Sequence, residues 1–190
     1  MTTVLLFHHA LGQTSGFLAF AEDLRRAGHT VHAPDLYDGA IFRDLDEGVA
    51  HAKRIGFSEV LRRGEATAEG LPADVVYAGF SLGGMPAQSL AQGRPGARGA
   101  ILYHSCLPPD EFESPWPQGL PLQIHMMDGD PWGEEDLPAA RALVDGTEGA
   151  ELFLYPGSGH LFADPSADDY DEEAAALLRE RTLAFLSRVG

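Results

Sequence analysis

Residues 75–84 read Val-Val-Tyr-Ala-Gly-Phe-Ser-Leu-Gly-Gly, and this stretch decides the fold. It begins as a run of β-branched and aromatic residues, which is typical of a buried strand. It then passes through Gly-x-Ser-x-Gly into a segment of helix-forming composition at 82–92. A serine on such a strand-to-helix turn is strained and exposed, and the N-terminus of the next helix stabilises negative charge beside it. The pattern therefore predicts that Ser81 is a nucleophile, with Gly79 and Gly83 where a Cβ would collide.

Two further segments carry side chains that could activate this serine. Met-Asp-Gly-Asp at 127–130 follows an apolar run, and His160 follows the strand-like run 151–155 and a glycine-rich turn. The order serine, acid, histidine is one of the arrangements known for nucleophile–base–acid triads. Each gap is long enough to hold at least one strand–helix unit, so each group can follow a different strand. Asp128 and Asp130 are both candidates for the acid.

Each of these residues also has an ordinary structural interpretation. Ser81 could cap a helix N-terminus, the aspartates could stabilise a turn beside Gly129, and His160 could be a loop residue. Singly, these interpretations are the more common ones. Jointly, they require three groups to fall in this order by accident, each just after a strand, so the sequence favours the catalytic interpretation.

Composition restricts the classes of protein that this chain can be. Its 190 residues suit one domain, spanning 1–190. A formal net charge of −16 argues against nucleic acid and anionic membranes as partners. Cys106 is the only cysteine, and the first residues lack the basic and apolar regions of a signal peptide. We therefore expect a cytoplasmic protein without an internal disulfide.

The rest of the chain alternates between strand-like and helix-like segments. Expected strands lie at 4–8, 30–33, 74–80, 100–104, 122–126 and 151–155. Expected helices lie at 15–27, at 45–69 with breaks at Gly56 and Gly64, at 82–92, at 134–144 and near the C-terminus. This alternation predicts a three-layer α/β fold, with a mostly parallel sheet of about six strands and helices on both faces. The proline-rich segment 107–121 is too short for a large cap domain.

Ligands of such sheets bind beyond the carboxyl ends of the strands. The polar residues that follow the strands are concentrated there, in segments 8–11, 35–37, 104–106, 127–130 and 160–162, together with Ser81. Neither a P-loop nor a Gly-x-Gly-x-x-Gly motif is present, and no metal-ligand spacing is visible. We expect neither a cofactor nor a metal.

These residues resemble the dienelactone hydrolase family of the α/β-hydrolase superfamily over nearly the whole chain. The resemblance is carried by Phe-His-His-Ala-Leu-Gly at 7–12, Pro-Asp-Leu-Tyr at 34–37, the segment 79–84, the acidic turn 128–130 and Tyr-Pro-Gly-Ser-Gly-His at 155–160. It implies a compact α/β-hydrolase fold and the cleavage of esters or lactones by a nucleophile–His–Asp triad. It also implies that no cofactor is needed.

The sequence departs from the best-known members at two positions. Ser81 stands where they have a cysteine, and His9 stands where they have a glutamate that holds the resting thiol. The family pattern of glycine, two residues and aspartate makes Asp130 the matching acid, although Met127 replaces that glycine. The backbone N–H groups of Ala10 and Leu82 are then the expected oxyanion donors.

The sequence gives the least information about which residues line the substrate pocket. We expect His9 to line the oxyanion loop, Tyr37, Trp116 and Phe162 to wall a small apolar pocket, and Arg43 to bind a substrate carboxylate, as family members use arginine. Each could equally be a packing or solvated residue. The expected function is hydrolysis of small carboxylic esters or lactones. Acyl transfer or perhydrolysis on the same triad, and non-catalytic binding of a small ligand, are the alternatives.

Overall fold

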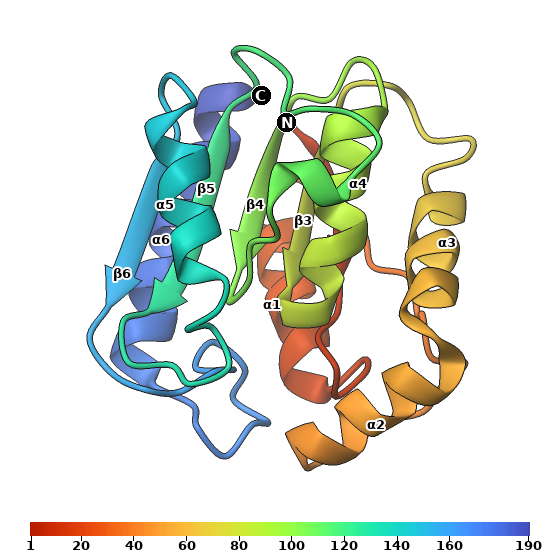
Figure 1. Ribbon diagram of the computed structural model, residues 1–190, viewed down its shortest axis with the longest axis vertical. Coiled ribbons are helices and arrows are strands. Elements are labelled where there is room, and N and C mark those ends of the chain that lie inside the picture. Colours follow the sequence, from red (N-terminus) through yellow and green to blue (C-terminus); the bar gives the residue numbers. More distant parts are fainter.

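The computed structural model describes residues 1–190, and Figure 1 shows it as a sheet between two layers of helices. Six strands form one sheet in the order β2-β1-β3-β4-β5-β6, and all neighbours are parallel. The strands are β1 (Thr3–Phe7), β2 (Thr30–His32), β3 (Val75–Phe80), β4 (Gly99–Tyr103), β5 (Leu122–Met127) and β6 (Glu151–Tyr155). The strands all point toward the same edge of the sheet, which brings the loops after them together.

The helices are α1 (Ser15–Arg26), α2 (Leu45–Ile55), α3 (Phe57–Thr67), α4 (Gly84–Gly93), α5 (Leu137–Asp145) and α6 (Glu172–Val189). Helices α1 and α6 cover one face of the sheet and share a core cluster with it. Helices α3, α4 and α5 cover the other face through a second cluster. Figure 1 shows α2 at the edge of the sheet toward which the strands point.

The alternation of side chains along each strand separates these two cores. Along β1, Val4 and Leu6 pack into the cluster under α1 and α6. Leu5 and Phe7 pack into the cluster under α3, α4 and α5. Strands that are buried on both faces read as continuous apolar runs, and for this reason the strands could be found in the sequence. The predicted three-layer fold with a mostly parallel six-stranded sheet is confirmed.

The segment 45–69 differs in detail from the expectation of two breaks. It is interrupted at Gly56, where φ is 95°, a value that favours glycine. Gly64 instead lies inside α3. The residue at this position is a glycine because a Cβ there would collide with Pro86 of α4. A glycine that indicated a break in the sequence therefore allows two helices to pack closely.

Three further features concern membrane spans, metal ligands and thiols. No helix combines the length and the apolar character that crossing a bilayer requires. No group of three or more His, Cys, Asp or Glu side chains is arranged to hold a metal ion. The single cysteine, Cys106, is a free, buried thiol.

The close packing of α3 on α4 predicts the effect of adding one methyl group at Gly64. Gly64→Ala should lower the free energy of unfolding by about 1–3 kcal/mol, because the Cβ overpacks against Pro86. Gly93→Ala, at an open helical position, should change it little or raise it by up to ~1 kcal/mol. Urea unfolding of both variants checks this, and equal stability of the two would contradict the packing argument.

Candidate active site

The turn between β3 and α4 is built by close backbone contacts. A Cβ on Gly79 would collide with the carbonyl oxygen of Gly83, and one on Gly83 would lie 2.6–2.7 Å from the carbonyl oxygens of Phe7 and His8. The turn is therefore pressed onto the end of β1. Ser81 sits at its tip with φ of 49°, a strained value for a residue with a side chain.

A side chain from the neighbouring strand end supports this strained residue. The hydroxyl of Ser105, just beyond β4, donates a hydrogen bond of 2.9 Å to the carbonyl oxygen of Ser81. The same hydroxyl fills the space beside Gly84, where a Cβ would collide with it. Ser105 is thus a supporting residue that the sequence did not single out, although segment 104–106 was expected on this edge.

The side chains of Ser81, His160 and Asp130 form one chain of contacts. Oγ of Ser81 lies 2.7 Å from Nε2 of His160, and Nδ1 of His160 lies 2.6 Å from Oδ2 of Asp130. His160 and Asp130 are both buried, whereas Ser81 is partly exposed. Asp130 is itself fixed, because its other oxygen accepts a 2.9 Å hydrogen bond from the N–H of Trp132. A carboxylate only accepts hydrogen bonds, so Nδ1 of His160 carries the proton and Nε2 faces Ser81 as an acceptor.

The alternative acid lies elsewhere on the same turn. Asp128 is exposed, and its Oδ1 accepts a 3.3 Å hydrogen bond from the N–H of Gly157. It therefore ties the turn after β5 to the turn after β6. Of the two candidate acids, only Asp130 contacts the imidazole of His160.

The loop after β1 brings a free backbone donor to this region. Ala10 is buried, and its N–H makes no hydrogen bond within the protein. The loop is held close to α2, because a Cβ on Gly48 would collide with the carbonyl oxygen of Ala10. Leu82 lies within a short 3₁₀ turn (Ser81–Gly83) that precedes α4, where backbone N–H groups at a helix start lack internal acceptors.

His9 lies in this loop, where it is buried and does not line the pocket that contains Ser81. Its Nδ1 accepts a 3.3 Å hydrogen bond from the N–H of Leu11, so Nε2 carries the proton and donates to Oδ2 of Asp164 over 2.7 Å. Thr14 donates to the same oxygen over 2.5 Å. Burial alone would raise the pKa of Asp164, but the hydrogen bonds from His9 and Thr14 and the charge of His9 lower it overall.

The other side chains expected to bind substrate also lie outside the pocket that contains Ser81. Tyr37 and Phe162 are buried in the two cores, and Arg43 is exposed to solvent. Trp116 packs against the core, and its indole N–H donates to the carbonyl oxygen of Leu120 over 3.4 Å. Their burial depends on segments distant in sequence, so the local sequence around them did not reveal it.

The pocket beside Ser81 and His160 has a volume of about 400 Å³. Its apolar wall consists of Phe57, Leu82, Met85, Leu107 and Trp132. Its polar wall consists of His104, Ser105, Glu111 and Asp136. Leu107 and Glu111 come from the proline-rich segment 107–121. Phe57 and Met85 come from the first turns of α3 and α4, and Trp132 and Asp136 come from the loop between β5 and α5.

His104 is an unusual member of this wall. It has a φ of 66°, it is 1% exposed, and neither ring nitrogen has a hydrogen-bond partner. Its ring centre lies 6.0 Å from that of His160. Burial first, and then the charge of His160, lower the pKa of His104 well below its ordinary value, so the ring is neutral. Strain and unpartnered polar atoms therefore both occur beside Ser81.

The neighbouring thiol is not a second nucleophile. Burial, with a smaller effect from the charge of Asp136, raises the pKa of Cys106 to about 12. Its backbone N–H donates a 3.1 Å hydrogen bond to Oδ2 of Asp136. Since a thiol must ionise to react, Cys106 serves here as a small buried residue.

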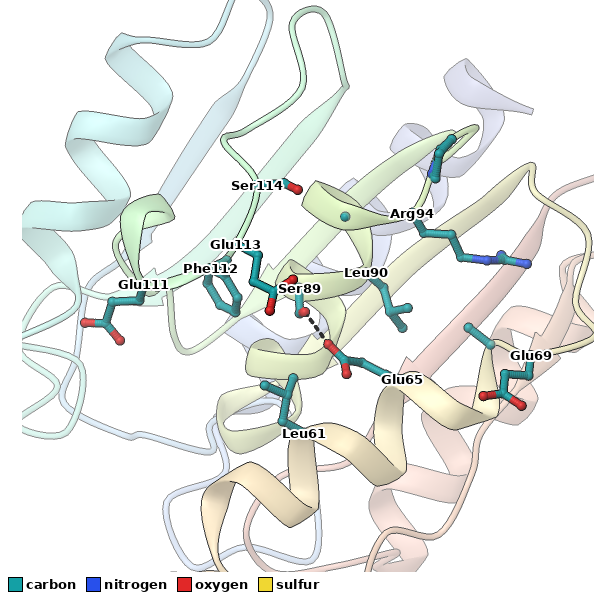
Figure 2. Close-up of a pocket in the computed structure, with 13 residues that line it drawn as sticks. Leu61, Glu65, Glu69, Ser89, Leu90, Arg94, Glu111, Phe112, Glu113 and Ser114 are labelled. Carbon is teal, nitrogen blue, oxygen red and sulfur yellow. Dashed lines mark hydrogen bonds between the residues drawn. The ribbon is translucent and has the colours of Figure 1, made fainter.

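A larger cavity of about 580 Å³ lies between α3, α4 and the segment 111–114, and Figure 2 shows it. Its centre is polar, where the hydroxyl of Ser89 donates to a carboxylate oxygen of Glu65 over 2.6 Å. Glu111 lines both cavities, but Figure 2 shows its carboxylate pointing away from the Ser89–Glu65 pair. Neither Ser81 nor His160 lines this larger cavity.

Solved structures similar to this chain all share its fold at low sequence identity. A dienelactone hydrolase from Anabaena variabilis superimposes with a TM-score of 0.71 at 18% identity, covering 99% of this chain and 86% of that one. The apo form of esterase 2 from Thermogutta terrifontis gives 0.73 at 15% identity, covering 100% and 84%. A protein of the α/β hydrolase superfamily from Xanthomonas campestris gives 0.69 at 19% identity, covering 99% of both chains.

No curated protein sequence matches the chain. The profile of the dienelactone hydrolase family matches residues 1–190. This match covers the β3–α4 turn, both aspartates and His160, and so confirms the resemblance found in the sequence. With the α/β-hydrolase fold and the geometry around Ser81 described above, the chain belongs to the dienelactone hydrolase family.

Proposed function

We propose that this protein hydrolyses small carboxylic esters or lactones through an acyl-enzyme on Ser81. The observation that carries the proposal is the chain of short contacts from Ser81 to His160 to Asp130, at a strained turn at the mouth of a pocket. A nucleophile, a base and an orienting acid in mutual contact are the geometric requirements for acyl transfer. Membership of a hydrolase family supports the same chemistry.

In the first half of the reaction, Nε2 of His160 takes the proton of the Ser81 hydroxyl while Oγ bonds to the carbonyl carbon. The carbonyl oxygen becomes negative and is stabilised by the N–H groups of Ala10 and Leu82. Asp130 keeps the imidazole oriented and stabilises its positive form. The bond to the leaving alcohol then breaks, and His160 returns the proton to that alcohol.

In the second half, water takes the place of the alcohol. His160 removes a proton from water, the hydroxyl attacks the acyl carbon, and the same N–H groups stabilise the second oxyanion. When the bond to Oγ breaks, Ser81 regains its proton from His160 and the carboxylic acid leaves. No metal or cofactor takes part in this scheme.

Several observations support small substrates. The pocket holds about 400 Å³, and the segment that contributes Leu107 and Glu111 is too short to form a separate lid over a long acyl chain. A net charge of −16 disfavours docking on an anionic lipid surface. A solved esterase from Thermogutta terrifontis with this fold has been captured phosphonylated by sarin, which suggests an organophosphorus probe for the present chain.

Replacing the proposed nucleophile is the first test. Ser81→Ala should lower kcat for a short-chain ester by about 10⁴-fold or more and abolish labelling by a fluorophosphonate. Ser89→Ala removes a hydroxyl outside this pocket and should leave both readouts unchanged. Ester turnover is measured by steady-state kinetics, and labelling is measured by mass spectrometry. Full labelling of the Ser81→Ala protein would refute the proposal.

The two aspartates of the turn after β5 provide the second test. Asp130→Asn should lower kcat by about 10⁴-fold, because an asparagine favours the wrong tautomer of His160. Asp128→Asn should retain nearly full activity, since its contact is with a backbone N–H at the surface. Steady-state kinetics of both variants at several pH values decide the matter, and a larger loss from Asp128→Asn would reverse the assignment.

A third test concerns the loop that carries Ala10. Asp164→Asn should lower kcat about 10-fold or more with little change in KM, because His9 and Thr14 lose the carboxylate that orders the loop. Asp168→Asn, an exposed change nearby, should have no effect.

The same variant has a pH signature in stability. The lowered pKa of Asp164 stabilises the wild-type fold above the unfolded pKa of about 3.9, and this contribution disappears as the pH falls through the folded value. The stability gap between wild type and Asp164→Asn should therefore be largest near neutral pH and shrink in acid. A gap independent of pH in urea unfolding would show that the carboxylate charge is unimportant.

A further inference from the structure

The wall of the pocket beside Ser81 carries acidic and aromatic side chains but neither arginine nor lysine. Its charged residues are Asp136 and Glu111, and Trp132 supplies an exposed ring. Arg43, the residue expected to bind a substrate carboxylate, is not part of this wall. The electrostatics of the pocket are therefore opposite to those that an anionic substrate requires.

Asp136 is the more sheltered of the two carboxylates. It is half-buried before α5, and its carboxylate accepts one hydrogen bond within the protein, from the N–H of Cys106. Burial raises the pKa of this carboxyl group, which means that its negative charge is incompletely solvated or paired. A cation that entered the pocket would supply the missing partner.

Trp132 provides a second kind of cation contact. Its side chain is 46% exposed, and its ring centre lies 6.1 Å from that of His160. Its backbone N–H donates to Oδ1 of Asp130, which places the residue beside the reacting groups. An exposed indole face attracts alkylammonium ions, and a carboxylate nearby strengthens this preference.

His104 is a further unusual feature of this wall and supports the proposal made below. Its imidazole is buried against the pocket, and both ring nitrogens lack a partner. Such a cost recurs at functional sites rather than in ordinary packing. Because the ring is neutral, it adds no positive charge that would favour an anion.

We propose that this pocket selects esters that carry an ammonium group close to the reacting carbonyl, and discriminates against esters that carry a carboxylate. Asp136 and Glu111 attract the cation, and Trp132 contacts it through its ring face. This proposal rests on the proposed hydrolysis by Ser81 and adds the class of substrate. It departs from the arginine–carboxylate contact that family resemblance implied.

The test compares three acetate esters of similar size that differ in charge. Acetylcholine carries a trimethylammonium group, 3,3-dimethylbutyl acetate replaces it with a neutral group of the same shape, and 3-acetoxypropanoate carries a carboxylate. We expect kcat/KM for acetylcholine to exceed that of the neutral ester by about fivefold to tenfold. The anionic ester should be the poorest substrate, and equal or inverted rates would overturn the proposal.

Variants of the pocket residues show which side chains cause the preference for the ammonium ester. Asp136→Asn should reduce the ratio of kcat/KM for acetylcholine to kcat/KM for the neutral ester to near one, and because each ratio is taken within one variant, a change in overall turnover does not affect it. Trp132→Leu should reduce the ratio partly. Glu135→Gln and Glu113→Gln each remove one nearby negative charge outside the pocket wall and should preserve the ratio. A ratio that falls equally in these controls would assign the effect to net charge alone.

The neutral ester keeps the two proposals separate. If the neutral ester is hydrolysed and Ser81→Ala abolishes this, the proposed function stands whatever the charge preference. If no ester is hydrolysed, the proposed function fails, and binding of choline to Ser81→Ala by calorimetry still tests the pocket. Binding that is weaker in the Asp136→Asn background would support the cation site, and absence of binding would overturn it.

Discussion

The whole site depends on the contact between the end of β1 and the turn after β3. Gly83 lies directly on the carbonyl oxygens of Phe7 and His8, and Gly79 lies against Gly83 itself. No side chain fits between these backbones. The contact therefore fixes where the loop that carries Ala10 stands relative to Ser81, before any side-chain interaction contributes. The oxyanion donors proposed here are positioned by backbone packing, which is stiffer than side-chain hydrogen bonding.

Strain is concentrated in the same place. Ser81 and His104 are neighbours on adjacent strand ends, and both have positive φ with a side chain attached. Residues in such conformations persist only where the surroundings hold them. The hydrogen bond from Ser105 to the carbonyl of Ser81, together with the stack of Phe80 on Tyr103 at 4.2 Å, supplies that hold.

The sequence predicted those parts of the molecule that depend on local pattern. Most strands were visible because they are apolar on both faces, although β2 is buried only at Val31. Ser81, Asp130 and His160 were visible because each lies in the segment that follows a strand. Their contacts agree with the expected arrangement, while their catalytic roles stay predictions. The family and the three-layer fold were likewise recognisable from the sequence and are confirmed.

Only part of the pocket wall could be predicted, because contacts between segments distant in sequence bring Phe57, Met85 and Trp132 into it. His9 forms a buried hydrogen bond with Asp164, which lies 155 residues away along the chain. Trp132 and Trp116 look alike in sequence, yet one is 46% exposed beside His160 and the other packs on the core. Gly64 suggested a helix break because its contact with Pro86 is a tertiary one. Periodicity and motif order carry no information about such contacts.

Buried neutral histidines link the folding of this protein to proton uptake. His8 donates from Nδ1 to the carbonyl oxygen of His9 and accepts at Nε2 from the N–H of Leu36, so it has no place for a second proton. Burial lowers the pKa of His8 to about 4 and that of His125 to about 3. An unfolded chain protonates these rings near pH 6.5, so the unfolded state binds more protons than the native state below that value. Acidification from about pH 6.5 toward pH 4 therefore favours unfolding, and the lowered pKa of buried His104 acts in the same direction.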